Sequence, residues 1–241
     1  MRILAIGNSF SEDATRYLNQ SALRSGVKID VANLMIGGCP LEWHYQNMLS
    51  GEKKYYLDFN GVRTGFMVSL SEALLCSHWD VITIQQVSQQ APFYDKYYEP
   101  YIQELAAYIR KCAPKAKLMI HQTWAYEEGS ARLTQELKYE KSADMLRDIV
   151  ESYNKAAEEI NADGIIRSGE MMYKLSQSGI GKVHRDTFHA GFGAPRYALS
   201  LIWLRTLCNV RVTGNSFSDF DVPVTDEEKK IVWEVVDSFE V

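Results

Sequence analysis

The chain has 241 residues, of which 46% are hydrophobic, 24% charged and 12% aromatic, and its net charge is −5. These values are typical of globular proteins and exclude disordered, collagen-like and coiled-coil chains. A mildly acidic chain without a basic run is a poor partner for nucleic acids or anionic membranes, and no apolar stretch approaches the roughly 18 residues of a membrane span. We therefore expect a single domain over residues 1–241 whose partner is a small molecule.

The N-terminal sequence and the cysteines both favour a cytoplasmic protein. The apolar run Ile3–Ile6 is too short for a signal peptide, and Gly7 ends it at once. The cysteines lie far apart, without a CxxC motif or zinc-type spacing, which favours reduced thiols; they are Cys39, Cys76, Cys112 and Cys208. A chain from which a leader had been removed would have the same features.

Apolar runs and amphipathic segments alternate along the chain. Ile3–Ile6 is a continuous apolar run, as in a strand buried on both faces; Asn60-Gly61 is a favoured hairpin turn; Thr225 and Glu228 have the spacing of a capping box. The predicted elements are a strand at 3–6, a helix from 11 towards 26, a strand at 28–35, a hairpin of 55–59 and 62–68, a helix at 71–79, a strand at 81–84, a helix at 96–112, a strand at 118–120, a helix at 139–161, a strand at 164–166, and helices at 169–177, 195–208 and 225–236.

Strands that alternate with helices imply βαβ units and a parallel sheet. The prediction is an α/β protein, a three-layer α/β/α sandwich with a flavodoxin-like parallel sheet of about five strands. We assign residues 51–70 to an inserted β-hairpin and residues 209–241 to a C-terminal helical extension.

Small or polar, non-acidic residues follow several of the predicted strands. Ligands of such folds bind in the crevice at the carboxyl ends of parallel strands. We therefore predict a binding site from the residues found there, which are Asn8, Ser9, Gly37, Gly38, the run Gln85-Gln86-Val87-Ser88-Gln89-Gln90, and residues 121–124.

Ser9 lies where the first strand turns into a helix. Backbone N–H groups at a helix N-terminus favour negative charge, and a serine becomes a nucleophile when a base takes its proton. The alternative is that Ser9 or Ser11 only caps the helix.

Asp186 and His189 form an Asp-x-x-His motif near the C-terminus. On a loop, an aspartate can meet the imidazole Nδ1 three residues later and leave Nε2 free to face a serine. A surface loop without a function is one alternative. A metal site that includes His184 is another, although no fourth ligand has a suggestive spacing.

Taken together, these motifs resemble the SGNH (GDSL-like) hydrolase superfamily. Gly7-Asn8-Ser9 corresponds to its Gly-Asp-Ser block, Gly38 or Gly37 to its glycine block, and Asp186-x-x-His189 to its last block. The resemblance implies a serine esterase with Ser9 as nucleophile, His189 as base and Asp186 as the residue that orients it. The Ser9 and Gly38 N–H groups would bind the oxyanion, and no cofactor or metal would be needed.

The third block of the superfamily, Gly-x-Asn-Asp, is absent. Ungapped counting along the strand places Gln89 at the asparagine position, with Gln86 as the alternative donor to the oxyanion hole. A glutamine amide donates the same hydrogen bond, but its extra methylene displaces the donor.

Further polar and aromatic residues are candidates for substrate contacts. At the strand ends these are Asn8, Gln85, Ser88 and Trp124. His121 is expected to be a hydrogen-bonded structural residue. A sugar-stacking platform and ordinary loop packing are equally compatible with the aromatic residues Trp43, Trp124, Tyr94, Tyr97 and Tyr98.

The expected function is hydrolysis of acetyl or other short acyl esters, which in this superfamily are often carried by carbohydrates. The alternative is a carbohydrate- or ligand-binding module that has kept the fold and lost a complete oxyanion hole. Asn8 and the missing third block favour this alternative, whereas the presence of all three candidate triad residues opposes it.

Overall fold

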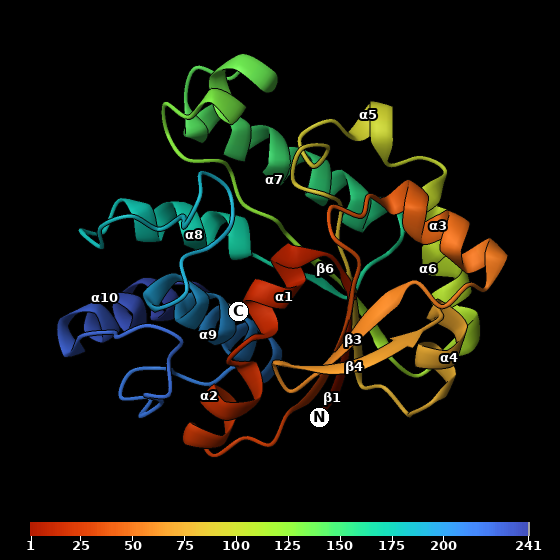
Figure 1. The fold of residues 1–241 in the computed structure, drawn as a ribbon, viewed down its shortest axis with the longest axis horizontal. Helices are drawn as coiled ribbons and strands as arrows, with labels where there is room; N and C mark the ends of the chain where they lie inside the picture. Colours follow the sequence, from red (N-terminus) through yellow and green to blue (C-terminus); the bar gives the residue numbers. More distant parts are fainter. Residues whose placement is uncertain (241) are drawn as a thin grey trace.

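The computed structural model describes residues 1–240 and contains one seven-stranded sheet in the order β4-β3-β2-β1-β5-β6-β7 (Figure 1). The strands are β1 (Arg2–Gly7), β2 (Asp30–Met35), β3 (Tyr55–Phe59), β4 (Val62–Val68), β5 (Val81–Ile84), β6 (Lys117–His121) and β7 (Gly164–Ile166). The helices are α1 (Ser9–Thr15), α2 (Leu18–Arg24), α3 (Leu41–Ser50), α4 (Leu70–Leu75), α5 (Tyr94–Tyr97), α6 (Tyr101–Cys112), the π-helical segment η1 (Arg132–Glu136), α7 (Ser142–Glu159), α8 (Ser168–Ser176), α9 (Ala194–Cys208) and α10 (Asp226–Asp237).

The strands β2, β1, β5, β6 and β7 are parallel, which confirms the predicted five-stranded core. Ile3 of β1 lies opposite Val31 on one side and Val81 on the other. All three side chains are buried, as expected for strands covered on both faces. The chain leaves β1 for β2 on one side and returns to β5 on the other. The carboxyl end of β1 is therefore at the switch point where α/β sheets bind ligands.

The predicted hairpin is present, and it extends the sheet. Asn60 and Gly61 both have positive φ angles, 49° and 79°, as a tight two-residue turn between strands requires. The strand β3 pairs antiparallel with β2, so that Leu57 lies opposite Leu34, and β4 forms the edge. The hairpin was predicted from its turn, whereas its attachment to β2 was not.

Helices cover both faces of the sheet, which confirms the three-layer α/β/α architecture. On one face α1, α2, α8 and α10 all pack against α9, while on the other α3 and α4 pack against α6 (Figure 1). Because α9 is surrounded in this way, it is apolar on nearly all sides. Among the described residues, none of the helices combines the length and the apolar character needed to cross a membrane.

Four helical features differ from the sequence prediction. The predicted helix from 11 towards 26 is interrupted at Tyr17, whose hydroxyl donates to the Phe192 carbonyl. The predicted helix 96–112 is divided into α5 and α6 because Pro100, which has no N–H to donate, stands at the N-cap of α6. The helix α3 and the segment η1 were not predicted.

Candidate active site

Ser9 is the first residue of α1 and is separated from β1 by Asn8 alone. Asn8 is the N-cap, and its Oδ1 accepts a hydrogen bond from the Phe10 N–H at 3.0 Å. Ser9 itself is therefore not the cap. Its backbone N–H has no acceptor within residues 1–240, and the residue lines a cavity of about 330 Å³.

The structure brings Ser9, His189 and Asp186 together. The Oγ atom of Ser9 lies 2.8 Å from Nε2 of His189, and Nδ1 of the same ring lies 2.7 Å from Oδ2 of Asp186. Burial of Asp186 opposes its ionisation, but hydrogen bonds from the His189 ring and from the backbone N–H groups of His189 and Phe188 outweigh it and lower the pKa of Asp186 to about 2. An ionised Asp186 accepts Nδ1–H, and this tautomer leaves Nε2 as an acceptor for the Ser9 hydroxyl.

The Asp186–His189 segment is a tight loop closed by backbone pairing. His184 and Ala190 form an isolated bridge, and the Arg185 N–H donates to the His189 carbonyl at 2.9 Å. Thr187 has a φ of 101°, a region that a β-branched residue rarely adopts. The unusual backbone lies between the two catalytic candidates, where strained residues tend to gather.

Trp124 supports this loop from beneath. Its Nε1 donates to the Phe188 carbonyl at 2.7 Å, and its ring stacks on Phe10 with centroids 4.1 Å apart. The side chain is fully buried, so the prediction that Trp124 contacts substrate is wrong. The indole instead holds the residue next to His189 in place.

Two backbone N–H groups can serve an oxyanion hole. Gly38 lines the same cavity as Ser9, and its φ of 62° is left-handed, a conformation that glycine adopts without penalty. The N–H of Gly38 has no acceptor among residues 1–240, in common with that of Ser9.

The two predicted glutamine donors differ. Gln89 is exposed and lines the cavity, so its amide remains a candidate third donor. Gln86 is buried, its Nε2 donates to the Tyr97 carbonyl at 2.9 Å, and its Oε1 accepts the Leu41 N–H at 3.0 Å. The structure thus places Gln86 away from the cavity and corrects the prediction that it serves the oxyanion.

A buried amide network lies under Ser9. Asn8 Nδ2 donates to the Cys39 carbonyl at 3.1 Å, and Asn8 Oδ1 accepts from Gln85 Nε2 at 2.9 Å. Gln85 Oε1 in turn lies 2.7 Å from Nδ1 of His121, a ring that burial keeps neutral by lowering its pKa to about 3. The polar side-chain atoms of Asn8 and Gln85 are therefore bonded within the protein. Gln85 does not line the cavity beside Ser9, which corrects its predicted role in substrate contact, whereas Asn8 does line that cavity.

Gly7 makes this network possible. A Cβ atom at this position would lie 2.7 Å from the side chain of Gln85 and 2.7 Å from Oγ of Ser11. The glycine before Asn8 is thus required by the close approach of Gln85 rather than by its backbone angles.

An ion-pair cluster that the sequence analysis missed joins α1 to the His189 loop. Asp13 is fully buried and accepts hydrogen bonds from Arg185 and from Arg196 at 2.7–2.9 Å. Asp13 lies on the same face of α1 as the buried residues Phe10 and Ala14, and a charged residue on an apolar face is the signal that could have identified it.

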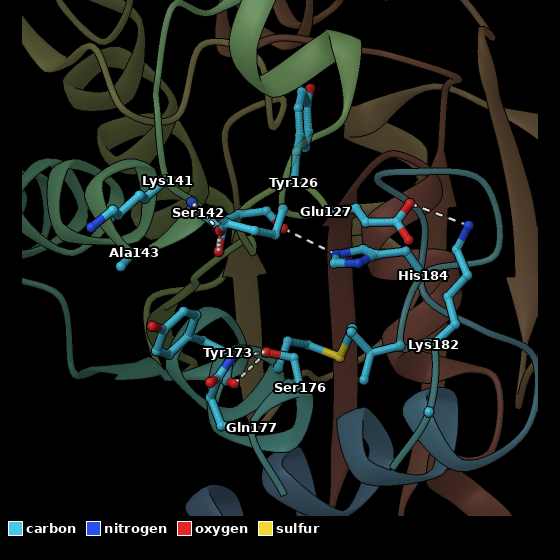
Figure 2. Close-up of a pocket in the computed structure, with 15 residues that line it drawn as sticks. Tyr126, Glu127, Lys141, Ser142, Ala143, Tyr173, Ser176, Gln177, Lys182 and His184 are labelled. Carbon is cyan, nitrogen blue, oxygen red and sulfur yellow. Dashed lines mark hydrogen bonds and ion pairs between the residues drawn. The ribbon is translucent and has the colours of Figure 1, made fainter. Parts of the chain in front are cut away.

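A second cavity, of about 430 Å³, shares Tyr126 with the first (Figure 2). Several of its ionisable groups have partners within the protein. Glu127 and Lys182 are 3.2 Å apart, and His184 Nε2 lies 3.1 Å from the Ala125 carbonyl. His184 is therefore bonded to the backbone and not to Asp186 or His189. Among residues 1–240, no three His, Cys, Asp or Glu side chains form a group that could hold a metal ion.

Most of the aromatic residues considered for sugar stacking pack inside the protein. Trp124, Tyr94 and Tyr98 are buried, and the rings of Tyr94 and Tyr98 stack on each other. Trp43 is exposed, but it does not line the cavity beside Ser9. Of the predicted substrate contacts, Ser88 does line that cavity, and its hydroxyl lies 3.0 Å from the Tyr126 hydroxyl.

Comparison with known proteins assigns the chain to a family. The profile described as "Domain of unknown function (DUF4886)" matches residues 2–231. The chain belongs to the DUF4886 family. A crystal structure of a DUF4886 family protein from Bacteroides uniformis is 30% identical, covers 99% of this chain and 93% of its own, and has a TM-score of 0.88. Among curated proteins, no sequence matches.

More distant solved structures share the fold of this DUF4886 protein. A candidate SGNH hydrolase from Slackia heliotrinireducens is 22% identical, with a TM-score of 0.59 over 86% of this chain and 98% of its own. A family 3 carbohydrate esterase from Clostridium thermocellum is 11% identical, with a TM-score of 0.52 over 85% of this chain and 94% of its own. At these identities the likeness is one of fold, and that fold is SGNH-like.

Proposed function

We propose that the protein is a serine hydrolase of short acyl esters. The observation that carries the proposal is the unbroken hydrogen-bonded chain from Ser9 Oγ through His189 to Asp186, with distances of 2.8 Å and 2.7 Å. The three residues come from opposite ends of the sequence and meet at the switch point of the sheet. A serine that only capped its helix would not need an imidazole oriented by a carboxylate.

In the proposed reaction, Ser9 Oγ attacks the ester carbonyl carbon while His189 Nε2 takes the hydroxyl proton. The N–H groups of Ser9 and Gly38, with Gln89 as third donor, bind the oxyanion of the tetrahedral intermediate. The intermediate collapses when the C–O bond to the alcohol breaks and His189 returns the proton to that alcohol. Water then attacks the acyl-serine by the same route and releases the acid.

The size of the cavity and the fold both support the proposed substrate class. A cavity of about 330 Å³ is at the small end of ligand sites, which favours an acetyl or similarly short acyl group. The fold that the chain shares with a carbohydrate esterase supports a sugar as the alcohol.

The experiment combines labelling with kinetics. A fluorophosphonate probe should label the wild-type protein at Ser9, and p-nitrophenyl acetate should be hydrolysed faster than its longer-chain homologues. Ser9→Ala and His189→Ala should each remove most of the activity, and the double variant should lose little more, because nucleophile and base act as one unit. Asp186→Asn should cost up to roughly 10⁴ in kcat, because the amide no longer holds the required tautomer.

Two results would overturn the proposal. Full activity of Ser9→Ala would exclude Ser9 as the nucleophile. The second result is a folded wild-type protein that reacts with none of the fluorophosphonate probe, the aryl esters and an acetylated sugar. A non-catalytic ligand-binding module would then be the better assignment.

A further inference from the structure

The cavity beside Ser9 has an unusual distribution of charge for an acidic protein. The chain carries a net charge of −5, yet no Asp or Glu of the described residues 1–240 lines this cavity. Apart from His189, the one basic residue in the described lining of this cavity is Arg132. The remaining lining residues are uncharged.

Arg132 is held close to the catalytic candidates by an aromatic ring. Its guanidinium carbon lies 4.1 Å from the centroid of the Phe188 ring, and that ring lies 3.9 Å from the imidazole of His189. The Phe188 ring thus bridges the guanidinium and the imidazole. A cation above an aromatic face is held in place while its N–H donors stay free at the rim of the guanidinium plane.

The charge of Arg132 is not neutralised by an ion pair. No carboxylate oxygen of residues 1–240 lies within 4.0 Å of its nitrogens, whereas the similarly half-buried Arg185 and Arg196 both pair with Asp13. The hydroxyls of Tyr126 and Ser88, 3.0 Å apart, lie on the wall of the same cavity. Because the two hydroxyls are hydrogen-bonded to each other, one of them donates within the pair and the other is left to donate outwards. Arg132 and that remaining hydroxyl form a donor set suited to a carboxylate.

We propose that Arg132 binds a carboxylate group carried by the ester substrate, and so makes the enzyme selective for anionic esters. The inference rests on the proposed esterase function and deepens it by naming a substrate class. The carboxylate can belong to either half of the substrate: a sugar acid or other acidic alcohol, or an acyl group derived from a dicarboxylic acid. In both cases the recognising chemistry is the same guanidinium–carboxylate pair.

Matched ester pairs that differ in charge test the proposal. The alcohol side is tested with 4-acetoxybenzoate against 4-acetoxybenzamide, and the acyl side with mono-4-nitrophenyl succinate against 4-nitrophenyl butanoate. Arg132→Gln should lower kcat/KM for the anionic member of one pair by about 10- to 100-fold, as expected for a hydrogen bond to a charged group. It should lower kcat/KM for the neutral members by less than about threefold, which also shows that the variant is folded.

Two further variants separate charge recognition from packing. Arg132→Lys keeps the charge but loses the planar fork, so its kcat/KM for the anionic ester should fall between those of wild type and Arg132→Gln. Arg24→Gln changes the net charge equally at an exposed position on α2, at the opposite end of the molecule from the segment around residues 130–140, and should leave both members of each pair unchanged (Figure 1).

The outcomes distinguish this inference from the esterase proposal. Equal losses for anionic and neutral esters in Arg132→Gln, or no preference of the wild type within either pair, would refute anion recognition and leave the esterase standing. If the wild type hydrolysed no ester, the esterase proposal would fail. Calorimetric titration of Ser9→Ala with 4-acetoxybenzoate would then test whether Arg132 binds a carboxylate. Binding that persists unchanged in the Ser9→Ala, Arg132→Gln double variant would refute the role of Arg132; binding lost tenfold or more would support it.

Discussion

Replacement of Asn8 by the aspartate that the resembling superfamily carries at this position should be harmful here. Asn8 Oδ1 accepts two hydrogen bonds, from the Phe10 N–H and from Gln85 Nε2, and a carboxylate would accept both. Asn8 Nδ2, however, donates to the Cys39 carbonyl at 3.1 Å. An ionised carboxylate cannot donate, so Asn8→Asp would leave the Cys39 carbonyl facing a second oxygen in a buried site.

The size of the effect follows from these contacts. Loss of the hydrogen bond to the buried Cys39 carbonyl should destabilise the fold by about 1–3 kcal/mol. The interaction of the new negative charge with the N-terminus of α1 should stabilise the fold by about 0.3–1 kcal/mol. We expect Asn8→Asp to lower the free energy of unfolding by about 1–2 kcal/mol at pH 8. When protonated, the introduced carboxyl group can donate to the Cys39 carbonyl, so its folded pKa is raised above the unfolded value of about 3.9. This stabilisation is present at low pH and is lost as the pH rises through the folded pKa.

Urea denaturation of wild type and variant at pH 5 and pH 8 tests the reasoning. The difference in unfolding free energy should be larger at pH 8 than at pH 5. Asn154→Asp, the same change at an exposed position on α7, should give a difference within about 0.5 kcal/mol at both pH values. An Asn8→Asp protein as stable as wild type at pH 8, or equally destabilised at both, would show that the Cys39 contact does not require an amide donor.

Three further predictions concern the oxyanion donor, the buried ion pair and acid stability. Gln89→Ala should lower kcat by about 10²–10³, whereas Gln86→Ala should mainly lower the free energy of unfolding, by about 1–3 kcal/mol. Kinetics measures the first effect and urea denaturation the second. A normal kcat in Gln89→Ala would show that the third oxyanion donor is another residue. Asp13→Asn removes the buried partner of Arg185 and should cost about 3–5 kcal/mol of unfolding free energy, against less than about 1 kcal/mol for Asp144→Asn in an exposed pair; equal effects would contradict the network. Burial lowers the pKa of His44 and of His121 to about 3. Below pH 6.5 the unfolded state therefore binds more protons than the folded state, and the free energy of unfolding should fall as the pH drops below about 6.5. His44→Asn should reduce that slope by about 1.2 kcal/mol per pH unit between pH 6 and 5, and an unchanged slope would mean that His44 titrates in the folded protein.

Much of the fold could be predicted because its signals are local. The bounds of β3 and β4 follow from the turn at Asn60-Gly61, and continuous apolar runs identify the central strands. The helix α3 was missed because its apolar residues recur weakly at helical spacing, and η1 because a single π-helical turn has no characteristic pattern. The pairing of β3 with β2 depends on a partner strand more than twenty residues away, which no local pattern specifies.

The candidate site was predictable in its order of motifs but not in its hydrogen bonds. Ser9 was identified from the Gly-Asn-Ser motif, and Asp186 and His189 from the Asp-x-x-His motif that they share. The glutamines could not be distinguished, because Gln86 is bonded to the Tyr97 carbonyl and the Leu41 N–H, groups whose proximity only the folded chain shows. Asp13 was overlooked for the same reason, since its partner Arg185 is 172 residues away in sequence.

Two departures from the superfamily pattern, Asn8 and the missing Gly-x-Asn-Asp block, initially favoured a protein that had lost catalysis. The structure gives them a different origin, because they contact each other. The amide of Asn8 donates to the carbonyl of Cys39, the residue next to Gly38, which a carboxylate could not do. Gln85, the first residue of the altered third block, donates to Asn8 and accepts from His121. The amide pair therefore fixes the helix N-terminus that carries Ser9 against the loop that carries Gly38, which is the arrangement that an oxyanion hole requires. Substitutions that maintain this arrangement are what a working enzyme would keep, and they weaken the argument for a module that only binds.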